Sequence, residues 1–312
     1  MSYTTQQETT ILKMASEGKS SRKIASKLNI SKSGVNYFLA RQEDLKSLVE
    51  TDKHKPKILV FDLETAAAVA LTFGRFKVNL SQSNIVTEGG WILCVAYRWL
   101  GEDKIHTLQL TQKEVSQQDD SRLIAALWEL YEEADAVVAH NALHFDHKVL
   151  QGRAAVMGFP PLPLVKVLDT LVLAKKHMRL PSNRLDAIGE HFGLGRKIET
   201  GGITLWKRVQ EGDAEAMKEM VTYCKQDTEL LTKVYLRLRA IGHAGSDFNA
   251  SLYYPDDETR CRRCGSTDIH ETGRKSHTGL SSFDEYRCDS CGAVQRARTS
   301  STTKEKRKTL LT

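Results

Sequence analysis

Runs of apolar residues in the centre of the chain predict an α/β domain. Four consecutive apolar residues, 58–61, indicate a strand that is buried on both faces, because such a strand lacks polar alternation. Residues 91–100 and 104–110 predict a hairpin of two further strands. Two more short strands are predicted at 136–139 and 164–168.

Helical periods lie between and after these strands. Residues 120–133 repeat apolar side chains at helical spacing, so we expect a helix that lies on the sheet. Residues 146–157 predict a second helix. After the strand predicted at 164–168, the chain is expected to be helical to about residue 240. Strands followed by alternating strands and helices are typical of a mixed sheet with helices on both faces.

The first 45 residues predict a small all-helical domain. Residues 8–42 divide into three short helices, with Ser20 and Ser31 as N-caps of the second and third. This pattern resembles a helix-turn-helix of the transposase and resolvase kind, with 31–41 as the recognition helix. The alternative is a small helical bundle whose basic face is either solvated or used to contact another protein. The expected core residues are Ile24, Leu28, Ile30, Val35 and Leu39, and the expected nucleic-acid contacts are Lys32, Ser33, Asn36 and Tyr37.

Charge is distributed unevenly along the 312 residues. The net charge of +6 divides into +5 for residues 1–57, −2 for 58–255 and +3 for 256–312. Basic ends around an acidic centre indicate a polyanionic partner, namely nucleic acid. The sequence contains no apolar run of the roughly 18–20 residues that a membrane span needs and no signal-peptide core. We therefore expect a cytoplasmic protein without a membrane partner.

Four of the six cysteines form two Cys-x-x-Cys turns, each followed by glycine, with 23 residues between Cys264 and Cys288. Each turn brings two thiolates onto one cation, and two turns complete a tetrahedral site, so the pattern resembles a zinc ribbon with one structural Zn²⁺. The other two cysteines, Cys94 and Cys224, are expected to be small buried side chains. The predicted zinc ligands are Cys261, Cys264, Cys288 and Cys291.

Acidic residues follow the predicted strands in three places. Asp62 and Glu64 end the first strand and share a face, because strand side chains alternate. Asp146 begins the helix after the 136–139 strand, 84 residues beyond Asp62. Tyr223 and Asp227 are four apart on a predicted helix, which places them on one face, and Asp227 follows Asp146 by 81 residues. Clustered carboxylates repel one another, so a cation is expected to neutralise them.

This order of motifs resembles the DEDD superfamily of 3′→5′ exonucleases, which have an RNase H-like fold, in its tyrosine (DEDDy) branch. The motifs are Asp-x-Glu at residues 62–64, the segment from Asn141 to Phe145-Asp146, and Tyr-x₃-Asp at residues 223–227. The histidine branch would need His where Thr222 stands. Further similarity at 168–170, 181–186 and 193–206 matches phage-encoded and YprB-like members, so the resemblance covers about residues 57–240.

The resemblance implies a two-metal mechanism with two Mg²⁺ or Mn²⁺ ions, since oxygen-rich sites suit these cations. It implies that Asp62 bridges both ions, that Glu64 and Asp227 bind the ion nearer the nucleophile, and that Asp146 binds the other. Tyr223 would orient the attacking water. Asn141 and Phe145 are expected to contact the substrate, with the alternative that Asn141 fixes the loop of the second acid.

We therefore expect a 3′→5′ exonuclease that acts on single-stranded DNA in phage replication, proofreading or recombination, in the host cytoplasm and with a separately encoded DNA polymerase as a possible partner. One alternative is a 3′→5′ exonuclease with the same site whose substrate is RNA. The other is a non-catalytic DNA-binding regulator or adaptor. The expected division of the chain is a helix-turn-helix domain at 1–45, a linker at 46–57, an RNase H-like domain at 58–240, a linker at 241–259, a zinc ribbon at 260–298 and a basic disordered tail at 299–312.

Overall fold

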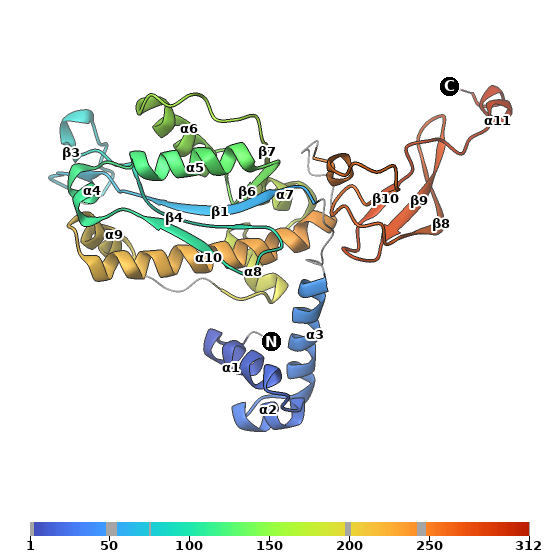
Figure 1. The fold of residues 1–312 in the computed structure, drawn as a ribbon, viewed down its shortest axis with the longest axis horizontal. Coiled ribbons are helices and arrows are strands. Elements are labelled where there is room, and N and C mark those ends of the chain that lie inside the picture. The colour runs from blue at the N-terminus through green and yellow to red at the C-terminus, as the bar shows by residue number, and fades with distance from the viewer. Residues whose placement is uncertain (1–2, 48–54, 75, 197–200, 242–247, 312) are drawn as a thin grey trace.

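A five-stranded mixed sheet forms the centre of the computed structural model, which describes residues 3–47, 55–74, 76–196, 201–241 and 248–311 (Figure 1). The strand order is β5-β4-β1-β6-β7, in which β1 pairs antiparallel with β4 and parallel with β6. All five strands predicted from the sequence are confirmed, as is the mixed α/β architecture. Their bounds are β1 Ile58–Thr65, β4 Ile92–Trp99, β5 His106–Gln109, β6 Ala136–Ala139 and β7 Lys166–Asp169.

Helices cover both faces of this sheet (Figure 1). Leu59 and Phe61 of β1 pack in one cluster with residues of α5 and α6, whereas Ile58 and Val60 pack with residues of α7, α8 and α10. Side chains alternate along a strand, so Asp62 and Glu64 continue the second series and face α10. The helices are α4 Gln112–Gln117, α5 Ser121–Glu133, α6 Asp146–Val156, α7 Thr170–His177, α8 Leu185–Phe192, α9 Ile203–Gln210 and α10 Ala214–Ile241.

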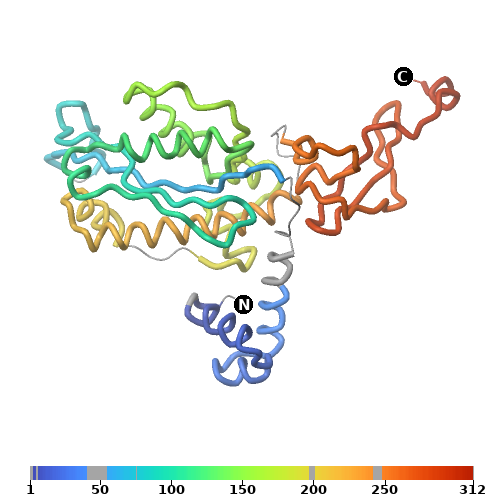
Figure 2. Tube along the Cα trace, in the orientation of Figure 1, coloured from blue at the N-terminus to red at the C-terminus, as the bar shows by residue number. Residues whose placement is uncertain are grey.

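The N-terminal helices form a separate small core, which Figure 2 shows below the sheet. Ile11, Ile24, Val35 and Phe38 are buried at its centre, while the predicted core residues Leu28, Ile30 and Leu39 are only partly buried. Gly34 lies within α3, where glycine leaves room for Tyr3, because a Cβ there would lie 2.1 Å from the Tyr3 hydroxyl. The three predicted helices are confirmed as α1 Thr5–Ser16, α2 Ser21–Leu28 and α3 Lys32–Ser47, although α3 is longer than expected.

The four-cysteine unit packs directly on the sheet domain. Its three-stranded sheet has the order β10-β9-β8, and Ala240 near the end of α10 contacts the cysteine cluster. The prediction that 241–259 is a linker is wrong for 248–254, because Phe248, Ala250 and Tyr254 are buried and fix this segment in place. Within the predicted linker at 46–57, residues 48–54 lie outside the described part of the chain. The elements here are η2 Ala250–Tyr253, β8 Ile269–His277, β9 Ser282–Cys288 and β10 Val294–Arg296.

Within the predicted disordered tail at 299–312, residues 300–302 contact β9. The backbone of Ser282 donates to the Thr302 hydroxyl at 2.7 Å and accepts from the backbone N–H of Ser301 at 2.8 Å, and helix α11 follows at Lys304–Lys308. Composition suggested disorder because the tail is polar and basic, but its Ser and Thr hydroxyls supply the hydrogen bonds that attach it to β9. None of the described helices combines the length and apolarity that a membrane crossing requires.

Candidate active site

Three of the predicted acids meet where β1 and α10 lie against each other. Asp62 and Glu64 come from the end of β1, and Asp227 comes from the middle of α10. One carboxylate oxygen from each lies within 4.8 Å of the other two. Asp227 is buried, and Asp62 and Glu64 are half-buried. Residues separated by more than 160 positions are therefore brought together as one acidic cluster.

Asp146 lies at the start of α6 beside this cluster but outside the 4.8 Å group. Burial raises the pKa of its carboxyl well above the usual range, and the neighbouring charge of Asp62 raises it further. Its Oδ1 atom is buried and has no hydrogen-bond partner among the described residues. A buried carboxylate with an unsatisfied oxygen next to other carboxylates is the situation that a bound cation would relieve.

A further acid, Asp169, holds the loop that leads to Asp146. Its carboxylate accepts the backbone N–H groups of Asn141 at 3.0 Å and Leu143 at 3.1 Å. It also caps α7 by accepting the N–H groups of Leu171 at 2.9 Å and Val172 at 3.3 Å. Asp169 is 4% exposed. Asp169 therefore anchors the loop between β6 and α6, a role that none of the sequence motifs predicts.

Tyr223 lies one turn before Asp227 on α10, as predicted. Its ring meets the ring of Trp206 on α9 edge to face, with the centroids 6.2 Å apart. Trp206 and Tyr223 are both half-buried, so the phenol ring is supported from one side while remaining partly accessible.

The structure adds Cys224, which sequence reasoning had classed as a packing residue. Its Sγ lies 3.3 Å from the backbone oxygen of Asp62 and 3.7 Å from Oδ2 of the same residue. Because the carbonyl and carboxylate oxygens of Asp62 accept, the thiol is the donor in these contacts. Burial raises the pKa of this thiol well above the usual range, and the neighbouring Cys94 raises it further. One turn later, the Thr228 hydroxyl donates to the backbone oxygen of Ala96 at 3.2 Å.

The donor set of the acidic cluster fits hard divalent cations. It consists of carboxylate oxygens, which Mg²⁺ and Mn²⁺ prefer, and no histidine among the described residues belongs to the cluster. A cation would also offset the mutual repulsion of three carboxylates in so small a volume. The cluster is therefore consistent with a divalent metal site.

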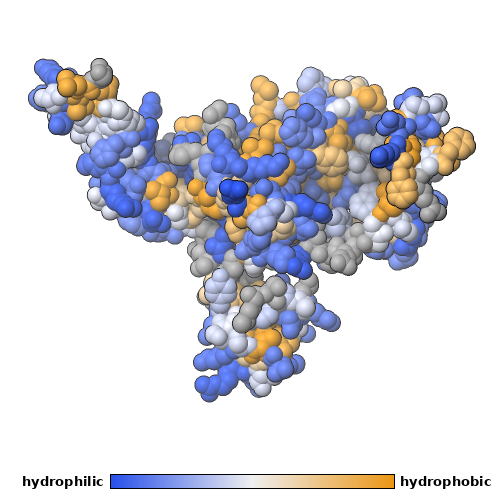
Figure 3. Space-filling view, turned by 180° about the vertical axis from the view of Figure 1, so that it is seen from behind, coloured by the Kyte–Doolittle hydropathy of each residue, from blue (hydrophilic) through white to orange (hydrophobic). Residues whose placement is uncertain are grey.

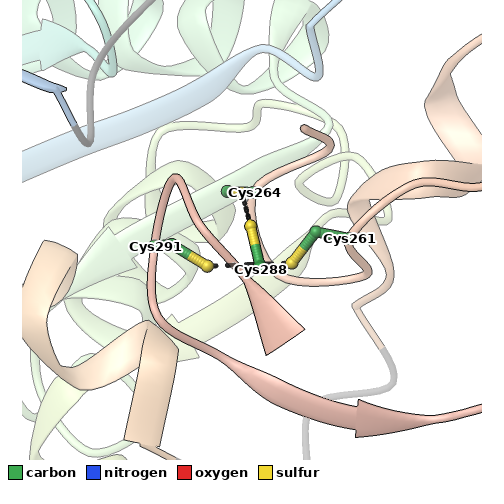
Figure 4. A group of neighbouring side chains, drawn as sticks. All are labelled: Cys261, Cys264, Cys288 and Cys291. Carbon is green, nitrogen blue, oxygen red and sulfur yellow. Dashed lines mark hydrogen bonds between the residues drawn. The ribbon is translucent and has the colours of Figure 1, made fainter. Parts of the chain in front are cut away.

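The four C-terminal cysteines form a second compact cluster (Figure 4). The Sγ atoms of Cys261 and Cys291 are 3.7 Å apart, and those of Cys264 and Cys288 are 3.6 Å apart. A tetrahedral Zn²⁺ with Zn–S bonds of about 2.3 Å requires sulfur pairs about 3.8 Å apart. The hydrogen bond from Cys264, followed by those from the other two cysteines, holds the pKa of Cys261 well below its usual range. The spacing of the four sulfurs is therefore compatible with the zinc site of a zinc ribbon.

The predicted nucleic-acid contacts lie in different places. Asn141 is half-buried in the loop anchored by Asp169, with a left-handed backbone at φ +68°, and Phe145 is exposed next to Asp146. The candidate contacts of the N-terminal domain are all exposed at the start of α3, as a groove-reading surface requires, and are Lys32, Ser33, Asn36 and Tyr37.

An apolar arm, residues 66–90, extends from the end of β1. Its base is fixed, because the Gln210 side chain of α9 both donates to the backbone oxygen of Ala67 at 2.9 Å and accepts from its N–H at 3.0 Å. Its outer part is unusually exposed, with Phe73 and Phe76 at 113% and 89%, and Figure 3 shows hydrophobic side chains at this end of the molecule. Exposed apolar clusters commonly mark interaction sites. The arm contains η1 Gln82–Asn84 and two short paired strands, β2 Val69–Ala70 and β3 Ile85–Thr87.

Comparison with known proteins identifies the class. The family model described as the RNase_H superfamily matches residues 84–239, half of the chain, and the protein belongs to that superfamily. Residues 3–42 match bacterial regulatory proteins of the luxR family, which supports the helix-turn-helix. The matched superfamily range begins after β1, so Asp62 and Glu64 lie outside it.

Other comparisons add little. A solved structure of the family B DNA polymerase from the hyperthermophilic archaeon Pyrobaculum calidifontis is similar at 14% identity and a TM-score of 0.44. The similarity covers 62% of this chain but only 26% of the polymerase. A likeness this low carries no argument about activity. No curated protein sequence matches the chain.

Proposed function

We propose that the protein is a metal-dependent 3′→5′ exonuclease of the DEDDy type that acts on single-stranded DNA and releases nucleoside monophosphates. The observation that carries this proposal is the meeting of Asp62, Glu64 and Asp227 within 4.8 Å, with Asp146 beside them. All four acids and the tyrosine of the motif set are present.

We assign the roles of the residues as the motif resemblance implies. Asp62, Glu64, Asp146 and Asp227 would hold two Mg²⁺ or Mn²⁺ ions, which lower the pKa of an attacking water and neutralise charge on the leaving 3′ oxygen. The Tyr223 ring packs against Trp206, and its hydroxyl would form a hydrogen bond with the attacking water. This hydrogen bond would fix the direction from which the water attacks.

Around this site, the remaining parts of the chain would bind nucleic acid. We propose the helix-turn-helix at 1–45 as a DNA-contacting module and Asn141 and Phe145 as contacts of the strand end. We further propose one structural Zn²⁺ in the ribbon at 260–298, with the nuclease domain at 58–240 between these modules. A phage setting, action beside a DNA polymerase and a cytoplasmic location belong to the same proposal.

A second candidate is a DNA-binding regulator with an inert core, which the match of residues 3–42 to luxR-family regulators favours. The complete acid set weighs against an inert core, because an inactive centre would have no need to concentrate three carboxylates against their mutual repulsion.

The test is incubation of 5′-labelled single-stranded DNA with Mg²⁺ or Mn²⁺, beside RNA of the same sequence and the variant Asp62→Ala. A stepwise ladder on DNA that is absent from the variant supports the proposal. A ladder on RNA alone would make RNA the substrate. Intact DNA that is shifted equally by both proteins in a gel would favour the regulator.

A further inference from the structure

A buried thiol connects the two elements that carry the acids. β1 supplies Asp62 and α10 supplies Asp227, so the spacing of the acidic cluster depends on how α10 is seated on the sheet. Cys224 lies on the face of α10 that meets β1 and is fully buried. Its Sγ is within hydrogen-bond distance of both the backbone oxygen and Oδ2 of Asp62, at 3.3 and 3.7 Å.

A second contact one turn along α10 completes the attachment. The Thr228 hydroxyl donates to the backbone oxygen of Ala96 on β4, and Ala96 is the residue paired with Asp62 in the β1–β4 register. The two contacts differ in kind. Among the described residues, the Thr228 hydroxyl donates to backbone oxygens, those of Ala96 and Cys224, whereas the Cys224 sulfur also reaches the carboxylate of Asp62.

We propose that Cys224 is a positioning residue, whose thiol orients the carboxylate of Asp62 toward Glu64 and Asp227 so that the three can share a divalent cation. The inference rests on the proposed function. Three carboxylates within 4.8 Å repel one another, and an Asp side chain without a donor would lower this repulsion by rotating away from the other two. A fixed donor on α10 opposes that rotation before the cation arrives.

The test measures Mn²⁺ binding to the zinc-loaded full-length protein by isothermal titration calorimetry, without substrate. Cys224→Ala removes the donor, and Cys224→Ser keeps a donor of similar size. The matched control is Cys94→Ala, because Cys94 is also fully buried, neighbours Cys224, and lies opposite Glu64 in the register. Circular dichroism verifies folding, and Cys224→Val replaces the alanine variant if that variant does not fold.

We expect Cys224→Ala to weaken Mn²⁺ binding about fivefold, as the loss of a weak donor to a charged group implies. Cys224→Ser should recover most of the affinity, and Cys94→Ala should bind as the wild type does. Wild-type affinity in Cys224→Ala, or an equal loss in Cys94→Ala, would overturn the inference. If the wild type binds Mn²⁺ but cleaves no nucleic acid, the nuclease proposal fails while the binding comparison still decides the role of Cys224.

Discussion

Replacing Asp169 with alanine tests the loop that carries Asp146. The carboxylate accepts four backbone N–H groups, two from the 141–143 loop and two from the first turn of α7. With about 1.5 kcal/mol for each hydrogen bond to a charged acceptor in the loop and about 1 kcal/mol for the helix cap, Asp169→Ala should cost about 4 kcal/mol. This is a large part of the stability of an ordinary domain.

The assay is urea denaturation followed by tryptophan fluorescence, together with the rise in melting temperature that Mn²⁺ produces. Because the loop leads into α6, the variant should gain less stability from Mn²⁺ than the wild type does. Asp186→Ala is the control, since Asp186 lies in the first turn of α8, and its carboxylate has only local contacts among the described residues, with the N–H of the adjacent Ala187 and the exposed side chain of Arg184. A loss in Asp169→Ala no greater than in this control, with an unchanged response to Mn²⁺, would refute the assigned role.

Three further variants test other parts of the molecule. Because the pKa of Asp146 is raised, its protonated form stabilises the fold below the ordinary carboxyl pKa, and this contribution is lost as pH rises through the raised value. Without divalent ions, Asp146→Asn should therefore melt higher than the wild type at pH 8 and no higher at pH 4, and equal melting at pH 8 would contradict the assignment. We expect atomic absorption to find one zinc per wild-type chain and none in Cys288→Ser, which should also melt at a lower temperature; a zinc-free wild type would contradict this. Phe73→Ala with Phe76→Ala should raise KM for single-stranded DNA about fivefold or more with kcat unchanged, since base stacking contributes about 1–3 kcal/mol; an unchanged KM would exclude the arm from binding.

The sequence predicted the sheet well because buried strands are marked by local runs of apolar residues. The continuous run at 58–61 and the short run at 136–139 became the adjacent strands β1 and β6. Asp62 and Glu64 share a face because strand alternation is a local property, and Tyr223 precedes Asp227 by one helical turn for the same reason.

What the sequence missed depends on contacts between distant segments. Cys224 contacts Asp62 across 162 positions, and Asp169 binds backbone groups 26 and 28 positions earlier, so neither role has a local pattern. The tail at 299–311 has the composition of a disordered segment, and no local pattern predicts its hydrogen bonds with Ser282. An Asp that immediately precedes a helix, as Asp169 does, was the one available signal, since it is a preferred N-cap.

The central claim is that acids from β1 and α10 form a site that removes nucleotides from a free 3′ end. The most direct measurement compares linear and circular single-stranded DNA of the same sequence, incubated with Mn²⁺ and either wild type or Asp227→Asn. We expect the wild type to degrade the linear strand, to leave the circle intact, and to lose this activity in the variant. Cleavage of the circle, or equal degradation by the variant, would contradict the account.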